Sequence, residues 1–184
     1  MNFRRALFLV VTVLLVVAAS GVTRADDDPL AYNDPGMHFR PPDGWERVPI
    51  ENPDHSEKAP LAVFVFKKSK YDQRIITITA ESFAGSLDAF EVSHAGDLRK
   101  QGDSTFIEKQ DKTALANGMP AYWLKVNTSG TAGQFLRRYE YVVIDLTRGI
   151  VVSFFGRAGD FDEKEAKMAL SSLYVVVYPR KARQ

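Results

Sequence analysis

The chain has 184 residues, with 24 Lys and Arg against 23 Asp and Glu, and it contains no cysteine. The lack of cysteine excludes disulfide bonds, thiolate catalysis, Cys-ligated zinc and the lipid-modified cysteine of bacterial lipoproteins. The balance of charges provides no basic field for a nucleic acid, and about 160 residues after the leader are enough for one domain with its own core.

Residues 1–25 have the pattern of a secretory signal peptide. The first five residues carry two positive charges, residues 6–19 are almost entirely apolar, and small residues follow up to Ala25. Cleavage before Asp26 would remove three arginines and no acid, which leaves a net charge of −2. We therefore expect an exported protein, periplasmic or extracellular, with no membrane span after cleavage. The alternative is an uncleaved anchor, although the apolar run is shorter than the ~20 residues that a span needs.

Three segments follow the signal. Residues 26–35 are acidic and rich in turn formers, and we expect a flexible acidic leader. Its three adjacent aspartates are interpreted as solubilising, because they lack the ligand spacing and the glycine of a calcium loop. Residues 36–179 are predicted to form a single domain, and residues 180–184 are a short basic tail that we interpret as a solvated terminus.

The domain is predicted to open with a β-hairpin over residues 36–48. Met37 and Phe39 alternate with polar residues, Pro-Pro-Asp-Gly supplies a turn, and the chain returns at Trp45. Trp45 is interpreted as a core residue that covers the sheet. Residues 50–60 are predicted to form a surface loop, because they contain two prolines and no apolar period.

Two strands and a helix are predicted next. Residues 61–66 are apolar throughout, which predicts a strand buried on both faces, whereas residues 74–83 alternate and predict its antiparallel neighbour. Residues 87–101 are predicted to be helical, because Ser86 is a good N-cap and apolar residues recur at helical spacing. His94 lies on the apolar stripe of this helix, which is typical of a partly buried, hydrogen-bonded histidine.

Four antiparallel strands are predicted after the helix. The Asn-Gly pair at 117–118 is a strong turn signal between strands at 104–112 and 121–127. Residues 135–157 predict two long strands joined at residues 147–149. The first of these is apolar on both faces through its second half, which places it in the middle of a covered sheet.

A second helix of little more than three turns is predicted after the long strand pair. Asp160 or Asp162 suits its N-cap, with an acidic residue three positions later as a capping box requires. Apolar residues recur at i, i+3, i+4 and i+7 on its expected inner face. Residues 174–178 follow as a final strand, which a proline ends.

Helices that interrupt a run of antiparallel strands predict an α+β fold, with an antiparallel β-sheet sandwiched by helices and an N-terminal β-hairpin. Three short motifs, MHFRPPDGW at 37–45, NGMPAY at 117–122 and VVSFF at 151–155, resemble the PsbP-like family. The similarity extends over nearly the whole chain after the leader. It implies a PsbP-like α/β/α sandwich.

The resemblance also implies a class of function. In its plant branch the family provides an extrinsic accessory subunit of photosystem II that helps to retain calcium and chloride. A eukaryotic Ran-binding nuclear-import factor shares the fold, as do many small exported bacterial proteins of unknown role. Neither named branch is an enzyme, and the matching positions include no catalytic or ligand residue that can be transferred. The resemblance therefore implies a binding or accessory domain without naming a partner.

The residues themselves provide weak signals for chemistry. Ser153, His94 and Asp145 are the residue types of a hydrolase, but the serine lies within a strand and lacks a Gly-x-Ser-x-Gly elbow. The three histidines, His38, His55 and His94, have no paired spacing for a metal. We therefore expect no catalytic, cofactor-binding or metal-binding residues, no cofactor and no enzyme activity.

The sequence predicts an exported, non-enzymatic binding or accessory protein that acts through protein–protein contacts, possibly at a membrane-associated complex. We expect a monomer with an unidentified protein partner and no nucleic acid. The candidate partner surface consists of polar residues on the 50–60 loop and on the first long strand: Asp54, His55, Glu57, Arg137, Arg138 and Glu140. The alternative is a carrier of a small apolar ligand, held in a pocket between the sheet and a helix.

Overall fold

The computed structural model describes residues 28, 30–34, 36–50, 59–67, 69, 73–101, 105–129 and 135–175. The strands are β1 (Tyr32–Asp34), β2 (Met37–Phe39), β3 (Glu46–Val48), β4 (Pro60–Lys67), β5 (Gln73–Ser82), β6 (Phe106–Ala114), β7 (Pro120–Ser129), β8 (Phe135–Asp145), β9 (Arg148–Arg157) and β10 (Tyr174–Val175). The helices are α2 (Leu87–Lys100), the 3-10 helix η3 (Ala158–Asp160) and α3 (Glu163–Ala169). None of the helices in these ranges is long and apolar enough to cross a membrane.

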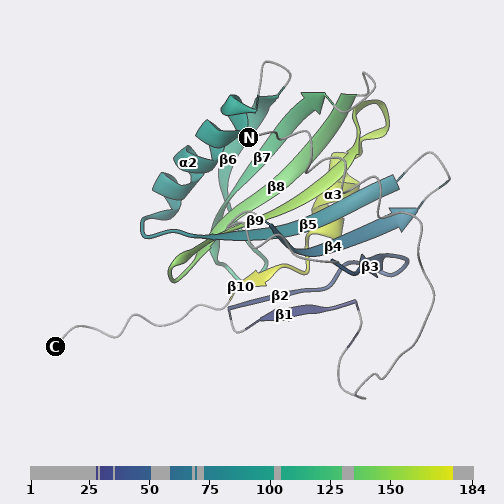
Figure 1. Cartoon of the computed structure of the whole chain (residues 1–184), viewed down its shortest axis with the longest axis horizontal. Helices are drawn as coiled ribbons and strands as arrows, with labels where there is room; N and C mark the ends of the chain where they lie inside the picture. Colours follow the sequence, from purple (N-terminus) through teal and green to yellow (C-terminus); the bar gives the residue numbers. More distant parts are fainter. Residues whose placement is uncertain are drawn as a thin grey trace.

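The central feature is a seven-stranded antiparallel sheet with the order β3-β4-β5-β9-β8-β7-β6 (Figure 1). Its middle contains β8 and β9, the predicted long strand pair, and Val142 and Val143 are both fully buried on opposite faces of β8. The position of a doubly buried strand in the middle of the sheet is thus confirmed. The turn is tighter than predicted, because Asp145 already pairs with Arg148.

A second, three-stranded sheet has the order β1-β2-β10 and corrects the predicted N-terminal hairpin. Met37–Phe39 pairs with β1 and β10, whereas Glu46–Val48 pairs with β4 of the large sheet. The two prolines between these strands have no N–H group for a ladder, so the chain crosses from one sheet to the other. Strand β1 also lies inside the segment expected to be a flexible leader.

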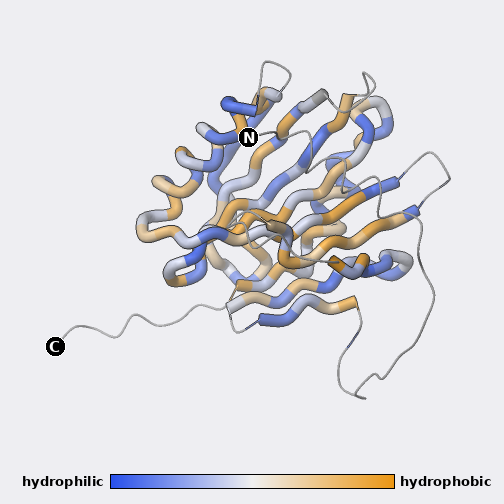
Figure 2. Tube along the Cα trace, in the orientation of Figure 1, coloured by the Kyte–Doolittle hydropathy of each residue, from blue (hydrophilic) through white to orange (hydrophobic). Residues whose placement is uncertain are grey.

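One face of the large sheet carries the main hydrophobic core. The small sheet and α3 cover this face, and Trp45 packs there against Phe66 and Phe154 with ring centroids 5.7 and 6.0 Å apart. The interpretation of Trp45 as a core residue is therefore confirmed. Figure 2 shows the hydrophobic runs along β4 and β5 and along the strands in the middle of the sheet.

Helix α2 packs on the opposite face of the sheet, against β6, β7 and β8. The Ser86 side chain accepts a hydrogen bond from the Ala89 N–H at 3.2 Å, which confirms the predicted N-cap. Phe90 and Leu98 are buried from this helix against Tyr122, Leu124 and other residues of the second core cluster. The two helices therefore cover opposite faces of the sheet, as an α+β sandwich requires.

Helix α3 begins after Asp162, whose carboxylate accepts a hydrogen bond from the Lys164 N–H at 2.8 Å. The capping residue is therefore Asp162, one of the two predicted alternatives. A buried arginine, Arg74 of β5, connects this region to the sheet: it donates to the Asp160 carbonyl oxygen at 2.9 Å and lies 3.4 Å from a carboxylate oxygen of Glu165. The sequence predicted a strand at Arg74 but not the burial of its charge.

Candidate functional site

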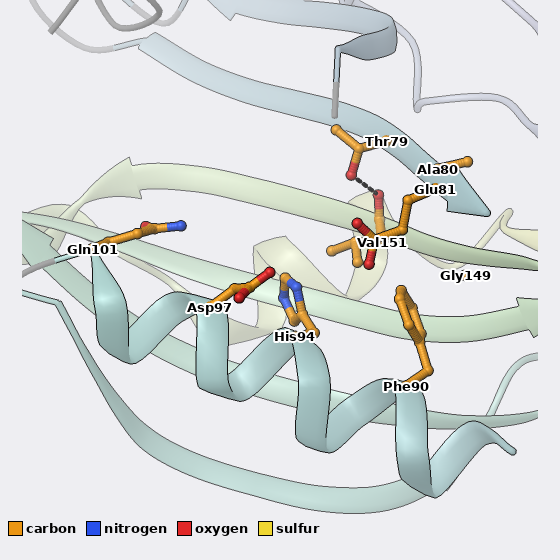
Figure 3. A pocket seen from close by; sticks show the side chains of 9 residues that line it. All are labelled: Thr79, Ala80, Glu81, Phe90, His94, Asp97, Gln101, Gly149 and Val151. Atoms are coloured by element: carbon orange, nitrogen blue, oxygen red, sulfur yellow. Dashed lines mark hydrogen bonds between the residues drawn. The ribbon is translucent and has the colours of Figure 1, made fainter. Parts of the chain in front are cut away.

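A narrow cleft of about 110 Å³ lies where α2 leaves the sheet uncovered. One wall is α2 and the other is the C-terminal half of β5, with β9 below them (Figure 3). In Figure 3, His94 and Asp97 extend from the helix towards β5, and Glu81 points back from β5 towards the helix. The lining residues are Thr79, Ala80, Glu81, Phe90, His94, Asp97, Gln101, Gly149 and Val151.

The end of this cleft depends on a close approach between α2 and β9 at Gly149. A Cβ atom at this position would lie 2.2 Å from ring atoms of Phe90, far inside van der Waals contact. Phe90 is 1% exposed and also packs against Phe83, so its ring cannot move away without displacing other core residues. The missing side chain at Gly149 therefore allows the helix to seat on the sheet.

Gly149→Ala is expected to destabilise the domain by about 2–3 kcal/mol, because the added methyl group overpacks the contact with Phe90. Urea unfolding followed by circular dichroism measures the loss. Gly96→Ala is the matched control, since a Cβ there meets nothing within 4 Å and alanine in a helix interior is neutral or stabilising by up to ~1 kcal/mol. Equal stability of the two variants would contradict the role of Gly149.

A buried carboxylate, Glu140 of β8, forms the polar floor beside the cleft. His94 Nε2 lies 2.9 Å from Glu140 Oε2, the Ser153 hydroxyl donates to Glu140 Oε1 at 3.0 Å, and Arg138 Nη1 lies 3.5 Å from the same oxygen. Burial alone would raise the pKa of Glu140, but the charges of Arg138 and His94 and the hydrogen bonds from His94 and Ser153 outweigh it. The net effect lowers the pKa of Glu140 from 4.5 to about 2.

This network corrects part of the predicted partner surface. Glu140 was expected to be exposed near the edge of the sheet, but its side chain is 1% exposed and β8 is a central strand. The reason is the register of the hairpin, which places Glu140 opposite Ser153 and below α2. Arg138 is also largely buried, with its guanidinium 5.6 Å from the Phe155 ring. The prediction that His94 is partly buried and hydrogen-bonded is confirmed.

The remaining members of that predicted surface lie apart from the cleft. Arg137 points to the other face of β8, where it donates to Asn127 at 2.8 Å and lies 3.4 Å from Glu108. Asp54, His55 and Glu57 lie outside the described residues.

The residues considered for hydrolysis do not form a triad. The Ser153 hydroxyl and His94 bind different oxygens of Glu140. Asp145 instead accepts a hydrogen bond from Arg148 at 2.5 Å, next to the small sheet. Within the described ranges, no three His, Asp or Glu side chains gather in a group that could hold a metal ion.

The sheet face beside the cleft carries a second feature, which we call the open strip: Val63, Val65, Ile75, Thr77 and Phe155. Alternation along β4, β5 and β9 places these side chains on the same face as α2. Their pairing places Val65 next to Ile75, and Ile75 next to Phe155. All five are half-buried, because α2 packs on the other half of this face.

The open strip was missed because residues 61–66 were predicted to be buried on both faces. That prediction is wrong for one face: Ala62 and Phe64 are in the core, but Val63 and Val65 are only half-buried, and Leu61 is 38% exposed. A continuous apolar run indicates burial without saying which element provides it. The side chains that cover one face of β4 are the small sheet and its neighbours, whereas no helix in the described ranges crosses the other face (Figure 1).

The cleft is a poor match to the predicted alternative of an apolar ligand carrier. Ligand pockets usually have ~300–1,000 Å³, several times the volume of about 110 Å³ found here. Polar and charged groups, including Glu81, Asp97 and Gln101, line much of the wall. The space suits water molecules or one inserted side chain, so carriage of an apolar ligand stays a prediction without support from the cleft.

Comparisons with known proteins place this architecture. No protein-family model matches the sequence, and no curated protein matches it by sequence. The structure is similar to that of cyanobacterial PsbP (CyanoP) from Synechocystis sp. PCC 6803, with a TM-score of 0.59, 14% identity and coverage of 85% of this chain and 98% of that one.

Two further solved structures are similar. PA94 of Pseudomonas aeruginosa, a protein of unknown function, has a TM-score of 0.55 at 14% identity, with 83% of this chain and 97% of that one covered. LpqN of Mycobacterium tuberculosis, described as involved in cell envelope biogenesis, has a TM-score of 0.52 at 16% identity, with 79% and 88% covered. Identities this low establish the fold alone. The chain has the PsbP-like fold that its three short sequence motifs predict.

Proposed function

We propose that the protein is an exported, non-enzymatic binding or accessory protein that recognises another protein through the open strip. The observation that carries this proposal is the incomplete cover of the sheet: α2 packs on β6, β7 and β8, and the same face of β4, β5 and β9 is left half-exposed. Neighbouring apolar side chains on three strands are rarely left uncovered without a function.

The composition of the open strip and its surroundings supports protein binding. Its floor consists of Val63, Val65, Ile75 and Phe155, and charged residues border it. On the outer side, Glu46 and Lys67 are both exposed and lie 3.5 Å apart; on the inner side is the polar cleft along α2. An apolar centre with a polar rim is the usual anatomy of a protein–protein interface.

Two further points support the non-enzymatic and exported parts of the proposal. The groups of the cleft floor that resemble catalytic residues are engaged with one another, since Glu140 holds both His94 and Ser153. Residues 1–25 have the pattern of a secretory signal. A protein of similar fold, LpqN, is described as involved in cell envelope biogenesis, which agrees with a role outside the cytoplasm.

Site-specific photo-crosslinking in the native host tests this proposal. A photo-reactive amino acid replaces Val65 in the open strip, and the matched control replaces Asp111, which is exposed on strand β6 at the far edge of the sheet. We expect a discrete protein adduct from position 65 and none from position 111, with loss of the adduct when Thr77→Arg is added. Adducts of equal yield at both positions, or none at position 65, would rule out the open strip as the binding surface.

A further inference from the structure

We infer that the partner segment bound on the open strip is an amphipathic α-helix, which lies beside α2 and presents basic side chains towards it. This inference rests on the proposed function and specifies the partner's chemistry. It follows from three features of the described residues: the hydrogen bonding of the strands, the dimensions of the open strip and the charges of the cleft.

The backbone of the open strip favours a helix over an extended segment. Strand β4 pairs with both β3 and β5, and β5 pairs with both β4 and β9, so their ladder groups are already used within the sheet. An extended peptide lying on this face would find no backbone partners and would bury unsatisfied N–H and C=O groups. A helix satisfies these groups internally and can pack its apolar side chains directly on the sheet.

The dimensions agree with one helix. Strands lie about 4.8 Å apart, so the three strands β4, β5 and β9 provide a floor close to the 10–12 Å diameter of a helix with its side chains. With 8 residues in β4 and 10 in β5, the strip is long enough for a helix of about 18 residues. The β-branched side chains Val63, Val65 and Ile75 form the flat surface on which sheets receive helices.

The charges of the cleft define the side of the helix that faces α2. Glu81 and Asp97 point into the cleft from opposite walls (Figure 3). Asp97 also pairs with Lys100 at 3.2 Å on the solvent side, and His94 is held by the buried Glu140. A helix lying on the open strip would place one flank along this acidic cleft, where lysine or arginine is favoured by charge complementarity.

Defined peptides test this inference. The probe is a fluorescein-labelled peptide of about 18 residues, with leucine at i, i+3, i+4 and i+7 spacing and lysine at the other positions. A second peptide has the same composition with leucine and lysine alternating, which favours a strand. A third keeps the helical pattern with glutamate in place of lysine. Fluorescence anisotropy at physiological salt measures their dissociation constants for the wild type and for three variants.

We expect the helical lysine peptide to bind about tenfold more tightly than the alternating peptide and the glutamate peptide. Ile75→Glu and Thr77→Arg should each weaken it about tenfold, whereas Asp111→Lys, at the far edge, should leave it unchanged. In Asp97→Lys the preference should move towards the glutamate peptide. Circular dichroism and urea unfolding confirm that each variant is folded; Thr77→Arg adds bulk without removing an apolar residue, so it decides the result if Ile75→Glu is unstable.

Equal binding of the helical and alternating peptides would overturn the helix assignment. Unchanged binding in a folded Thr77→Arg variant would show that the peptides bind elsewhere. The outcome is separable from that of the proposed function: an adduct from position 65 with no helical preference refutes the helix alone, whereas the absence of an adduct in the native host refutes the proposed function whatever the peptides do.

Discussion

Glu140→Ala is expected to destabilise the domain by about 3–5 kcal/mol, one of the two largest effects of a single substitution predicted for this chain. The carboxylate is 1% exposed, and its removal leaves Arg138 and the Ser153 hydroxyl beneath α2 without their partner. An uncompensated buried charge costs much more than a surface ion pair contributes. Chemical denaturation at pH 7 measures the loss, with Glu46→Ala as the control.

Glu46 has a 72% exposed side chain and a single lysine neighbour at 3.5 Å. Its replacement should change the free energy of unfolding by no more than about 0.5 kcal/mol. Similar effects of the two substitutions would contradict the burial and pairing of Glu140.

The same residue predicts a pH dependence. The pKa of Glu140 is about 2 in the folded protein against an ordinary value of 4.5, so the folded state holds its negative charge more strongly than the unfolded state does. The stabilisation is therefore fully present above about pH 4.5 and is lost as the pH falls towards 2. Glu140→Gln should reduce the slope of stability against pH in this window, while other paired carboxylates keep part of it. A slope identical to that of the wild type would contradict the shift.

Arg74→Ala is expected to destabilise the domain by about 3 kcal/mol or more. The side chain is 1% exposed and connects β5 to the segment before α3 through its hydrogen bond to the Asp160 carbonyl oxygen at 2.9 Å. Truncation removes the packing of the aliphatic stem, leaves that oxygen without this donor and leaves the Glu165 carboxylate without its cation. Thermal and urea unfolding measure the effect.

Two further variants separate charge from geometry at Arg74. Arg74→Lys keeps the positive charge but not the forked donor, so an intermediate loss is expected. Arg99→Ala, at an exposed position in the last turn of α2, should have little effect. Full stability of Arg74→Ala would show that η3 and α3 are held in place without this arginine.

The polar floor and the open strip have different physical roles in this structure. Glu140, His94 and Arg138 are directed inward and hold α2 over one half of the sheet face. Val65 and Ile75, on the other half, leave apolar area available to a partner. Substitutions in the floor should therefore reduce stability, and those in the strip should reduce binding with smaller effects on stability.

The prediction of secondary structure was most successful where the signal is local. Ser86 and Asp162 cap the helices because an N-cap depends on residues within one turn. The alternation of residues in β5 and the doubly apolar run in β8 follow from the two-residue period of a strand. The N-terminal hairpin was wrong because a turn signal such as Pro-Pro-Asp-Gly shows that the chain changes direction, without showing which strand each arm will pair with.

By itself, the amino-acid sequence determined the number and order of the main elements, the caps of both helices and the α+β class, because propensity, capping and periodicity act over a few residues. Only the tertiary structure decided which faces are covered. Glu140 is buried because the register of β8 with β9 places it opposite Ser153 and under α2. Val65 and Ile75 remain half-exposed because α2 packs on the other strands of the same face. Burial is a relation between elements distant in the chain, and no local pattern contains it.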